Sequence, residues 1–455
     1  MIGLNKIGLN QVQLNRLRLN APFPTCRKMA GGGGSSDGFP QLPGDVTRWH
    51  FGGLTNEMMA AMDDPRIEDA DHKGRFLSFK NFAWKEGSGI SDIYPGALVF
   101  DGVDDWAGCD NLPLLPKEKG YSIIALRNWI TRYDATQYKR PLISNLDTND
   151  EGAFLIEYRK DENVNDVTGS YNSFTDVYID DNNPITWQTS SSYNGQIIKK
   201  GTSKSSNKLC ICKTYFGQLS KYANAAIWEI VILDHDATEE ELTKIKDYFV
   251  KTYPWLFPDQ AWTVVGKTNE DEDRATITNI TGNGNDLVLS NFGFIEGSGY
   301  NEEGQYAGYL VTDGVDDKIA SSDFKMGKDF TIVGDWKFID NKKSGTGLVK
   351  GSSFYIYNTM IGLDLYINSG SVKNSLDGIK SINAACSDGR AYDRNWNEIL
   401  ANTGNVVGSG GILEVSSSGG RFDRIAFKNL AIYPRILSKD DCIKAYNYLQ
   451  TLKAK

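Results

Sequence analysis

The sequence Leu98-Val-Phe-Asp-Gly-Val-Asp-Asp105 occurs a second time in this chain, as Leu310-Val-Thr-Asp-Gly-Val-Asp-Asp317. The same two short motifs precede both copies: Asn-Phe and then Glu-Gly-Ser-Gly occur within residues 81–89 and again within residues 291–299. Self-similarity at a fixed spacing indicates a duplicated structural unit. Such a duplication favours an adhesive or binding protein over a protein built around a single catalytic centre.

The duplication extends to both sides of this pattern. Upstream, Gly53-Leu-Thr-Asn-Glu57 pairs with Gly266-Lys-Thr-Asn-Glu270. Downstream, residues 226–233 pair with residues 426–433. The repeated unit is therefore much longer than its central pattern.

Each copy ends in an amphipathic helical pattern. Thr238 and Ser438 precede these patterns and are suitable N-cap residues, and the acidic residues after them suit the positive end of the helix dipole. We expect repeat 1 at residues 45–258 and repeat 2 at residues 259–455, because each length is sufficient for a core of its own.

The segments between the central pattern and the closing helix are typical of β-strands. Runs such as Phe154-Leu-Ile-Glu-Tyr158 and Ser353-Phe-Tyr-Ile-Tyr357 are rich in β-branched and aromatic residues and are bounded by turn-forming residues. The 46 glycines and 22 tyrosines fit many tight turns and amphipathic strand faces. The sequence therefore predicts an all-β fold, with each repeat a sandwich or jelly roll.

The central pattern, followed by Tyr121-Ser-Ile-Ile-Ala125 in repeat 1 and by Asp329-Phe-Thr-Ile-Val333 in repeat 2, resembles concanavalin A-like and laminin-G-like jelly-roll domains. The repeats are also similar to modules in proteins of gut Bacteroidales and their phages. This resemblance implies two tandem jelly-roll sandwiches, each closed by a C-terminal helix. It also implies carbohydrate or protein binding and, in some members, glycan cleavage.

The sequence lacks the acidic pattern that glycan cleavage in this fold would require. Retaining enzymes of the fold place Glu-x-Asp-x-Glu or Glu-x-Asp-x-x-Glu on one strand, so that both catalytic carboxylates share a face. Neither string occurs here, and the acidic run at residues 270–273 fits a solvated loop. The histidines and the Cys210-x-Cys212 pair lack the spacing of a metal site. We therefore expect no enzymatic activity, no cofactor and no metal.

The duplicated Asp-Gly-Val-Asp-Asp pattern has two interpretations. Clustered carboxylates suit a calcium ion. The interpretation we favour is a tight turn in which Gly102 and Gly314 adopt a positive φ, while Asp101 and Asp313 accept hydrogen bonds from the local backbone.

The first residues contain a second, shorter repeat. Apolar residues recur in pairs every five residues and are followed by asparagine, a pattern that resembles the pentapeptide β-helix. About four such units cannot bury their own interior, so a partner is needed to complete them. We expect residues 1–25 to form an extended β-type anchoring arm and residues 26–44, which contain Gly31-Gly-Gly-Gly-Ser-Ser36, to form a flexible linker. A disordered tail is the alternative. The predicted anchoring residues are Ile2, Leu4, Ile7, Leu9, Val12, Leu14, Leu17 and Leu19.

The cysteine content and the apolar segments of the sequence bear on where the protein is expected to be found. The six cysteines are too few for a disulfide framework, and the sequence shows neither a secretory signal nor an apolar stretch long enough to span a membrane. We therefore expect a phage virion protein, a head or tail fibre or decoration, assembled in the host cytoplasm as a homo-oligomer. The arm would bind other virion proteins (capsid, portal or tail), and neither nucleic acid nor membrane insertion is expected.

The predicted ligand is a host-surface or mucosal glycan. Tethering two weak sugar sites raises their combined avidity through effective concentration. Aromatic rings that stack on sugars, close to amides and carboxylates, are the expected contacts. Candidates with these neighbours are Tyr171, Tyr178, Trp187, Tyr193, Tyr392 and Trp396. Two alternatives remain open, a purely structural decoration with protein partners only and a glycan hydrolase of the same fold.

Overall fold

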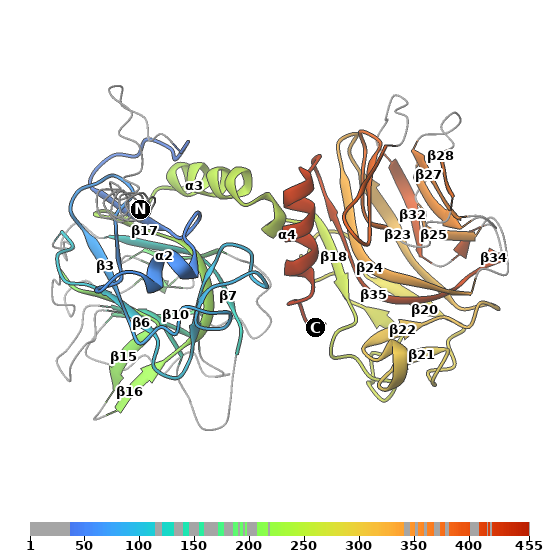
Figure 1. Cartoon of the computed structure of the whole chain (residues 1–455), viewed down its shortest axis with the longest axis horizontal. Helices are drawn as coiled ribbons and strands as arrows, with labels where there is room; N and C mark the ends of the chain where they lie inside the picture. The colour runs from blue at the N-terminus through green and yellow to red at the C-terminus, as the bar shows by residue number, and fades with distance from the viewer. Residues whose placement is uncertain are drawn as a thin grey trace, which may run out of the picture. The chain divides into compact units, whose positions relative to one another are not determined.

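The structure of the chain is a computed structural model (Figure 1). It describes residues 37–113, 121–131, 140–144, 154–158, 172–176, 185–189, 192–193, 196–197, 207–216, 219–340, 346–350, 354–358, 362–367, 374–377, 382–400, 409–415, 417–418 and 421–454. All the helices and strands described below lie in one compact unit, Pro43–Lys455.

The described residues form a mainly β structure, which confirms the predicted all-β class. Apart from β9 and β10, which run parallel, the paired strands in the described part of the chain are antiparallel. Antiparallel sheets can bury one face and leave the other exposed, and the alternating burial of β3 (Phe76–Lys80) and β20 (Leu287–Ser290) follows this pattern.

Two sheets are formed by strands of repeat 1. Sheet A has the order β13-β12-β11-β7-β17-β5-β4, and β1 also pairs with β17. Its strands are β1 (Val46–His50), β4 (Gly89–Ile90), β5 (Leu98–Asp101), β7 (Ser122–Trp129), β11 (Ile185–Thr189), β12 (Ser192–Tyr193), β13 (Gln196–Ile197) and β17 (Asn224–Leu233). Sheet B has the order β10-β9-β8-β14-β6-β3-β2. Its strands besides β3 are β2 (Arg66–Glu68), β6 (Trp106–Cys109), β8 (Arg140–Ser144), β9 (Phe154–Tyr158), β10 (Asn172–Asp176) and β14 (Leu209–Ile211).

Two further sheets are formed by strands of repeat 2. Sheet C has the order β21-β22-β35-β24-β29-β30-β31, and β18 also pairs with β35. Its strands are β18 (Gln260–Thr263), β21 (Gly299–Asn301), β22 (Tyr309–Val311), β24 (Thr331–Asp340), β29 (Ile382–Cys386), β30 (Arg390–Asp393), β31 (Glu398–Leu400) and β35 (Arg424–Tyr433). Sheet D has the order β19-β20-β23-β32-β25-β26-β27-β28. Its strands besides β20 are β19 (Thr276–Ile277), β23 (Lys318–Met326), β25 (Thr346–Lys350), β26 (Phe354–Asn358), β27 (Gly362–Ile367), β28 (Asn374–Asp377) and β32 (Ser409–Val415).

Short elements complete the described structure. Two hairpins stand apart from the large sheets: β15 (Lys213–Phe216) with β16 (Leu219–Tyr222), and β33 (Ser417–Ser418) with β34 (Arg421–Phe422). The helical elements are α2 (Asn56–Ala60), α3 (Glu239–Thr252), α4 (Lys439–Leu449) and the 3-10 turns η1 (Pro254–Leu256) and η2 (Gly304–Tyr306). Within the described residues, no helix has the length and apolar character needed to cross a membrane.

Each pair of sheets shares a hydrophobic core. In repeat 1, Phe100 of sheet A and Phe79 of sheet B belong to one buried cluster. In repeat 2, Phe427 of sheet C and Leu289 of sheet D belong to another. Alternate residues of a strand point to opposite faces, so the other face of each sheet is left for helices, loops or solvent.

The closing helices begin where the sequence predicts. Thr238 caps α3 with a capping box, because its side chain accepts a hydrogen bond from the backbone of Glu241 while the Glu241 carboxylate accepts one from the Thr238 backbone. Ser438 caps α4 by accepting a hydrogen bond from the Asp441 backbone. Helix α4 packs against β24 and β35, and Figure 1 shows it alongside sheet C.

The duplicated turn also has the predicted geometry. Gly102 has a φ of 77° and Gly314 a φ of 74°, in the region that glycine adopts most easily. One carboxylate oxygen of Asp101 accepts hydrogen bonds from the three following backbone N–H groups of residues 103–105, at 2.8, 3.2 and 3.3 Å. Asp313 does the same for residues 315–317. Each turn connects the two sheets of its repeat, since it leads from β5 of sheet A to β6 of sheet B and from β22 of sheet C to β23 of sheet D.

Candidate functional site

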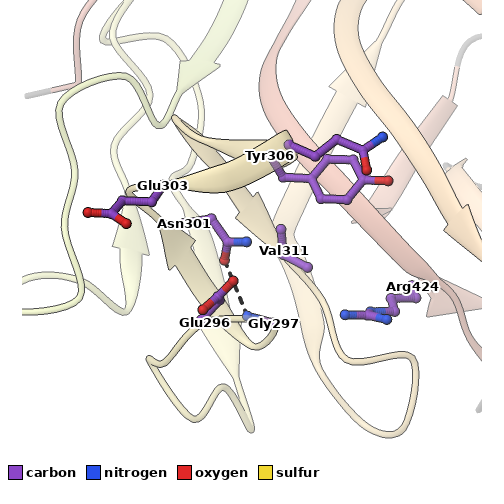
Figure 2. Close-up of a pocket in the computed structure, with 8 residues that line it drawn as sticks. Glu296, Gly297, Asn301, Glu303, Tyr306, Val311 and Arg424 are labelled. Atoms are coloured by element: carbon purple, nitrogen blue, oxygen red, sulfur yellow. Dashed lines mark hydrogen bonds between the residues drawn. The ribbon is translucent and has the colours of Figure 1, made fainter.

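A pocket with a volume of 390 Å³ lies at the edge of sheet C, within the range typical of small-ligand sites (Figure 2). Five segments form it: the turn at residues 296–297, β21, the loop containing η2, β22 and the first residue of β35. Its lining residues are Glu296, Gly297, Asn301, Glu303, Gln305, Tyr306, Val311 and Arg424.

The pocket has two chemically different sides. Figure 2 shows Glu296, Asn301 and Glu303 on one side, and Tyr306 and Arg424 on the other, with Val311 between them. The Asn301 side chain is held in place because it accepts a hydrogen bond of 3.2 Å from the backbone N–H of Gly297. One side therefore offers carboxylate and amide groups, and the other offers a guanidinium and a ring.

The charged groups of this pocket are left available for a ligand. Within the described part of the chain, the carboxylates of Glu296 and Glu303 and the guanidinium of Arg424 make no hydrogen bond, and no ion pair within 4.0 Å. Glu296, Glu303 and Arg424 are all exposed. Tyr306 is half-buried and packs against the apolar cluster of Tyr309, Val311 and Ala426. This packing fixes the ring at the pocket wall.

The matching corner of repeat 1 is closed by its own side chains. Glu86 corresponds to Glu296, and its carboxylate accepts hydrogen bonds from the Ser91 hydroxyl at 2.5 Å and from the Asp92 backbone at 2.8 Å. Asn224, at the position of Arg424, donates a hydrogen bond of 3.0 Å to the backbone oxygen of Asp101. The Glu86 carboxylate and the Asn224 amide nitrogen are therefore engaged within the protein.

The difference between the two corners has a simple origin in the sequence. Asn301 stands where repeat 1 has Ser91, and two extra residues separate Glu296 from Asp313 compared with Glu86 from Asp101. The longer loop contains η2 and carries Tyr306. The strand pairing supports this alignment, because Val99 pairs with Ala226 in repeat 1 as Val311 pairs with Ala426 in repeat 2. A comparison of the repeats, position by position, could have revealed this site from sequence.

Of the predicted sugar-contact residues, Tyr392 and Trp396 have described side chains, and neither lines this pocket. Tyr171 and Tyr178 lie outside the described residues, while Trp187 and Tyr193 lie on β11 and β12, where only the backbone is described.

The last pair of predicted contacts lies close together. Tyr392 has no exposed surface, so its predicted role as a stacking platform is wrong: its ring belongs to the interior. Trp396 is half-buried and contacts the rings of Tyr392, at 6.3 Å between centroids, and Tyr446, at 5.6 Å. An aromatic residue followed by polar neighbours does not reveal from sequence which of its faces is covered.

The acidic turns could also be considered as cation sites. Asp101, Asp104 and Asp105 in repeat 1 bring carboxylate oxygens within 4.8 Å of one another, and Asp313, Asp316 and Asp317 do so in repeat 2. One oxygen of Asp101 and one of Asp313 accept three backbone N–H groups each. These hydrogen bonds give the clustered aspartates a structural role, because they stabilise the turn.

Burial changes the acidity of the last carboxyl of each turn. Asp105 and Asp317 are fully buried, and burial raises the pKa of both to about 6. The nearby Asp101 and Asp313 carboxylates also raise these pKa values, and hydrogen bonds to the turn backbone lower them.

Comparisons with known proteins give remote matches. No family model matches the chain, and no curated protein matches it. Among solved structures, a Trypanosoma rangeli sialidase in complex with sialic acid is 11% identical with a TM-score of 0.31, over 58% of this chain and 48% of that chain. Domain 4 of the GH43 extracellular arabinanase AbnA from Geobacillus stearothermophilus, in complex with arabinotriose, is 13% identical with a TM-score of 0.32, over 42% of this chain and 98% of that domain. The binding domain of Paraclostridial Mosquitocidal Protein 1 is 14% identical with a TM-score of 0.23, over 42% of this chain and 51% of that chain.

One expectation from the sequence is corrected by these matches. We expected a protein without enzymatic activity, but the matched structures include sialidases, which are enzymes. The missing Glu-x-Asp-x-Glu string excludes only one catalytic arrangement, so it was too narrow a basis for that expectation. The chain spans about half the length of the first matched sialidase, and likeness at these TM-scores carries no activity over to this chain.

Proposed function

We propose that this protein binds a carbohydrate in the pocket of repeat 2. The observation that carries the proposal is the set of unpaired groups at a corner whose counterpart in repeat 1 is closed. Sugar hydroxyls both donate and accept hydrogen bonds, so they suit a pocket with carboxylates on one side and a guanidinium on the other. Tyr306 supplies an aromatic ring at the wall, and Val311 supplies an apolar contact.

The proposed setting of this site is a pair of tandem jelly-roll domains, repeat 1 at residues 45–258 and repeat 2 at residues 259–455. The two sheet pairs with separate cores support this assignment. Among the described residues, the open corner belongs to repeat 2, so we assign the sugar site to that repeat. Avidity would then come from several copies of the chain in a homo-oligomer rather than from two sites in one chain.

We further propose that the chain is a phage virion protein, with residues 1–25 as its anchor and a host or mucosal glycan as its ligand. The five-residue apolar repeat and the glycine-rich segment after it support this role. Deleting residues 1–25 should abolish incorporation into particles while leaving the calorimetric unfolding of residues 43–455 unchanged. Normal occupancy of the truncated protein in purified particles would contradict the anchoring role.

Binding can be tested by titrating the full chain with an oligosaccharide panel, using the variants Tyr306→Ala and Glu296→Gln. Both side chains lie at the pocket, so each change should weaken binding at least about tenfold without altering the melting temperature by more than about 2 °C.

Repeat 1 offers the matched control. Glu86→Gln changes the same residue of the closed corner and should leave sugar affinity unchanged. Equal loss of affinity in Glu86→Gln and Glu296→Gln would contradict the assignment of the site to repeat 2. Full affinity in Tyr306→Ala combined with Glu296→Gln would remove the pocket from sugar binding altogether.

A further inference from the structure

The outer face of sheet C carries a row of cations next to the pocket. Ile425 and Phe427 of β35 face the core, so the alternate residues Arg424, Ala426 and Lys428 share the opposite face. Arg424 belongs to the pocket, and Lys428 lies about 13 Å further along the strand by the rise per residue of a β-strand. Lys337 of β24 is the residue paired with Ala426, on the neighbouring strand.

Two of these cations are gathered around one aromatic ring. The Lys337 ammonium lies 4.2 Å from the centroid of the Tyr309 ring, and the Lys428 ammonium lies 5.8 Å from the same centroid. Both lysines are half-buried, so their charges are fixed near the surface rather than extended into solvent. The ring belongs to the apolar cluster that also packs against Tyr306 of the pocket. This cluster therefore lies between the pocket and the two lysines.

One carboxylate lies beside the two lysines. Asp335 is the neighbouring carboxylate, and it accepts a hydrogen bond of 2.9 Å from the Tyr309 hydroxyl. Across the residues the structure describes, Lys337, Lys428 and Arg424 have no carboxylate within 4.0 Å, and Lys428 instead donates to the Gln450 side chain. Burial lowers the pKa of Lys337, and the charges of Arg394 and Lys428 lower it further while Asp335 raises it. Two cations and one carboxylate therefore lie near this lysine.

Repeat 1 has no such surface at the equivalent positions. The residues that match Arg424, Ala426 and Lys428 are Asn224, Ala226 and Trp228. Trp228 is fully buried and donates a hydrogen bond of 2.9 Å to the backbone oxygen of Pro95. The cationic row is therefore specific to the repeat that carries the open pocket.

We propose that the ligand is an acidic saccharide chain, bearing carboxylate or sulfate groups, that extends from the pocket along β35 to Lys337 and Lys428. This inference rests on the proposed sugar binding in the pocket. A neutral sugar unit would occupy the pocket, because Glu296 and Glu303 repel an acidic group there. The acidic groups of the following units would pair with the cations, which raise the local concentration of an anionic chain.

The test uses dextran, dextran sulfate and polygalacturonate as probes for neutral, sulfated and carboxylated chains. We expect the full chain to bind at least one acidic polymer about tenfold or more tightly than dextran, with affinity falling as salt rises. The double variant Lys337→Gln with Lys428→Gln should lose this advantage and keep its affinity for dextran. The control variant, Lys246→Gln with Lys251→Gln, removes the same charge from exposed positions of α3 and should bind all three probes like the unmodified chain.

Three outcomes would overturn the inference. In the first, the protein binds dextran and both acidic polymers with equal affinity, and Tyr306→Ala loses dextran binding. The pocket would then be a neutral-sugar site, and the cationic row would take no part in recognition. An unchanged affinity of the lysine double variant for the acidic polymers would also show that Lys337 and Lys428 take no part in recognition. Binding of random-sequence duplex DNA as tightly as the acidic polymers would show a general response to polyanions. Failure of the protein to bind any saccharide would instead overturn the proposed function itself.

Discussion

Replacing Gly102 by alanine tests the turn on which the duplicated corner depends. Gly102 has a φ of 77°, and a Cβ atom added there would lie 2.8 Å from the Cβ and 3.1 Å from the backbone nitrogen of Asn224. Asn224 begins β17, which pairs with β1, β5 and β7, so this neighbour cannot move freely. The substitution therefore combines an unfavourable backbone conformation with a steric clash.

Gly96 separates these two contributions. Its φ is also 77°, but an added Cβ would have no atom within 4 Å. Gly96→Ala should therefore destabilise repeat 1 by only about 1 kcal/mol, the cost of the left-handed conformation. Gly102→Ala should cost about 2–4 kcal/mol, because crowding at a packed site adds roughly 1–3 kcal/mol.

Urea unfolding followed by tryptophan fluorescence, supported by calorimetry, measures both changes. The expected result is a clear difference between the two variants in the free energy of unfolding. Equal destabilisation by Gly96→Ala and Gly102→Ala would show that Asn224 of β17 can move away from the added Cβ without a cost in free energy. A loss below about 0.5 kcal/mol in both would refute the argument from φ as well.

Three further predictions concern stability. Arg48→Met should destabilise the protein by about 3–5 kcal/mol in urea unfolding, because it leaves the fully buried Glu229 carboxylate without the ion pair that Arg48 makes at 2.9 Å; a loss under 1 kcal/mol would contradict this. Asp105 and Asp317 bind protons more tightly when folded, so the stability they contribute is present at low pH and is lost as pH rises through about 6. Asp105→Asn with Asp317→Asn should therefore reduce the fall in melting temperature between pH 5 and pH 7.5, and an unchanged slope would refute it. Thr238→Ala should cost about 1 kcal/mol by removing the cap of α3, whereas an unchanged unfolding midpoint would show that the cap contributes nothing.

The features predicted well from sequence are those set by local chemistry. The turn at Gly102 needs a residue that tolerates a positive φ, and Asp101 can reach the backbone of its own turn. Thr238 and Ser438 cap their helices for the same local reason. The all-β class follows from many short strand patterns, and this prediction does not depend on the exact bounds of any one strand.

The site depends on long-range relations that single motifs do not encode. Arg424 reaches the pocket only because β35 pairs with β22, more than a hundred residues away in the sequence. Tyr392 was predicted as a ligand contact because its sequence neighbours are polar, but its ring is fully buried and contacts the Trp396 ring. The informative signal was the difference between the repeats, where Asn301 and Arg424 replace Ser91 and Asn224.

The number of ligands bound by each chain tests the central claim most directly. Isothermal titration calorimetry of the full chain, with a short acidic oligosaccharide that binds, measures this stoichiometry. Our account predicts one ligand per chain, because the corner of repeat 1 is filled by its own hydrogen bonds from Ser91 and Asp92 to Glu86. Two equivalent ligands per chain, or one ligand per chain with unchanged affinity in Arg424→Gln combined with Glu296→Gln, would contradict it.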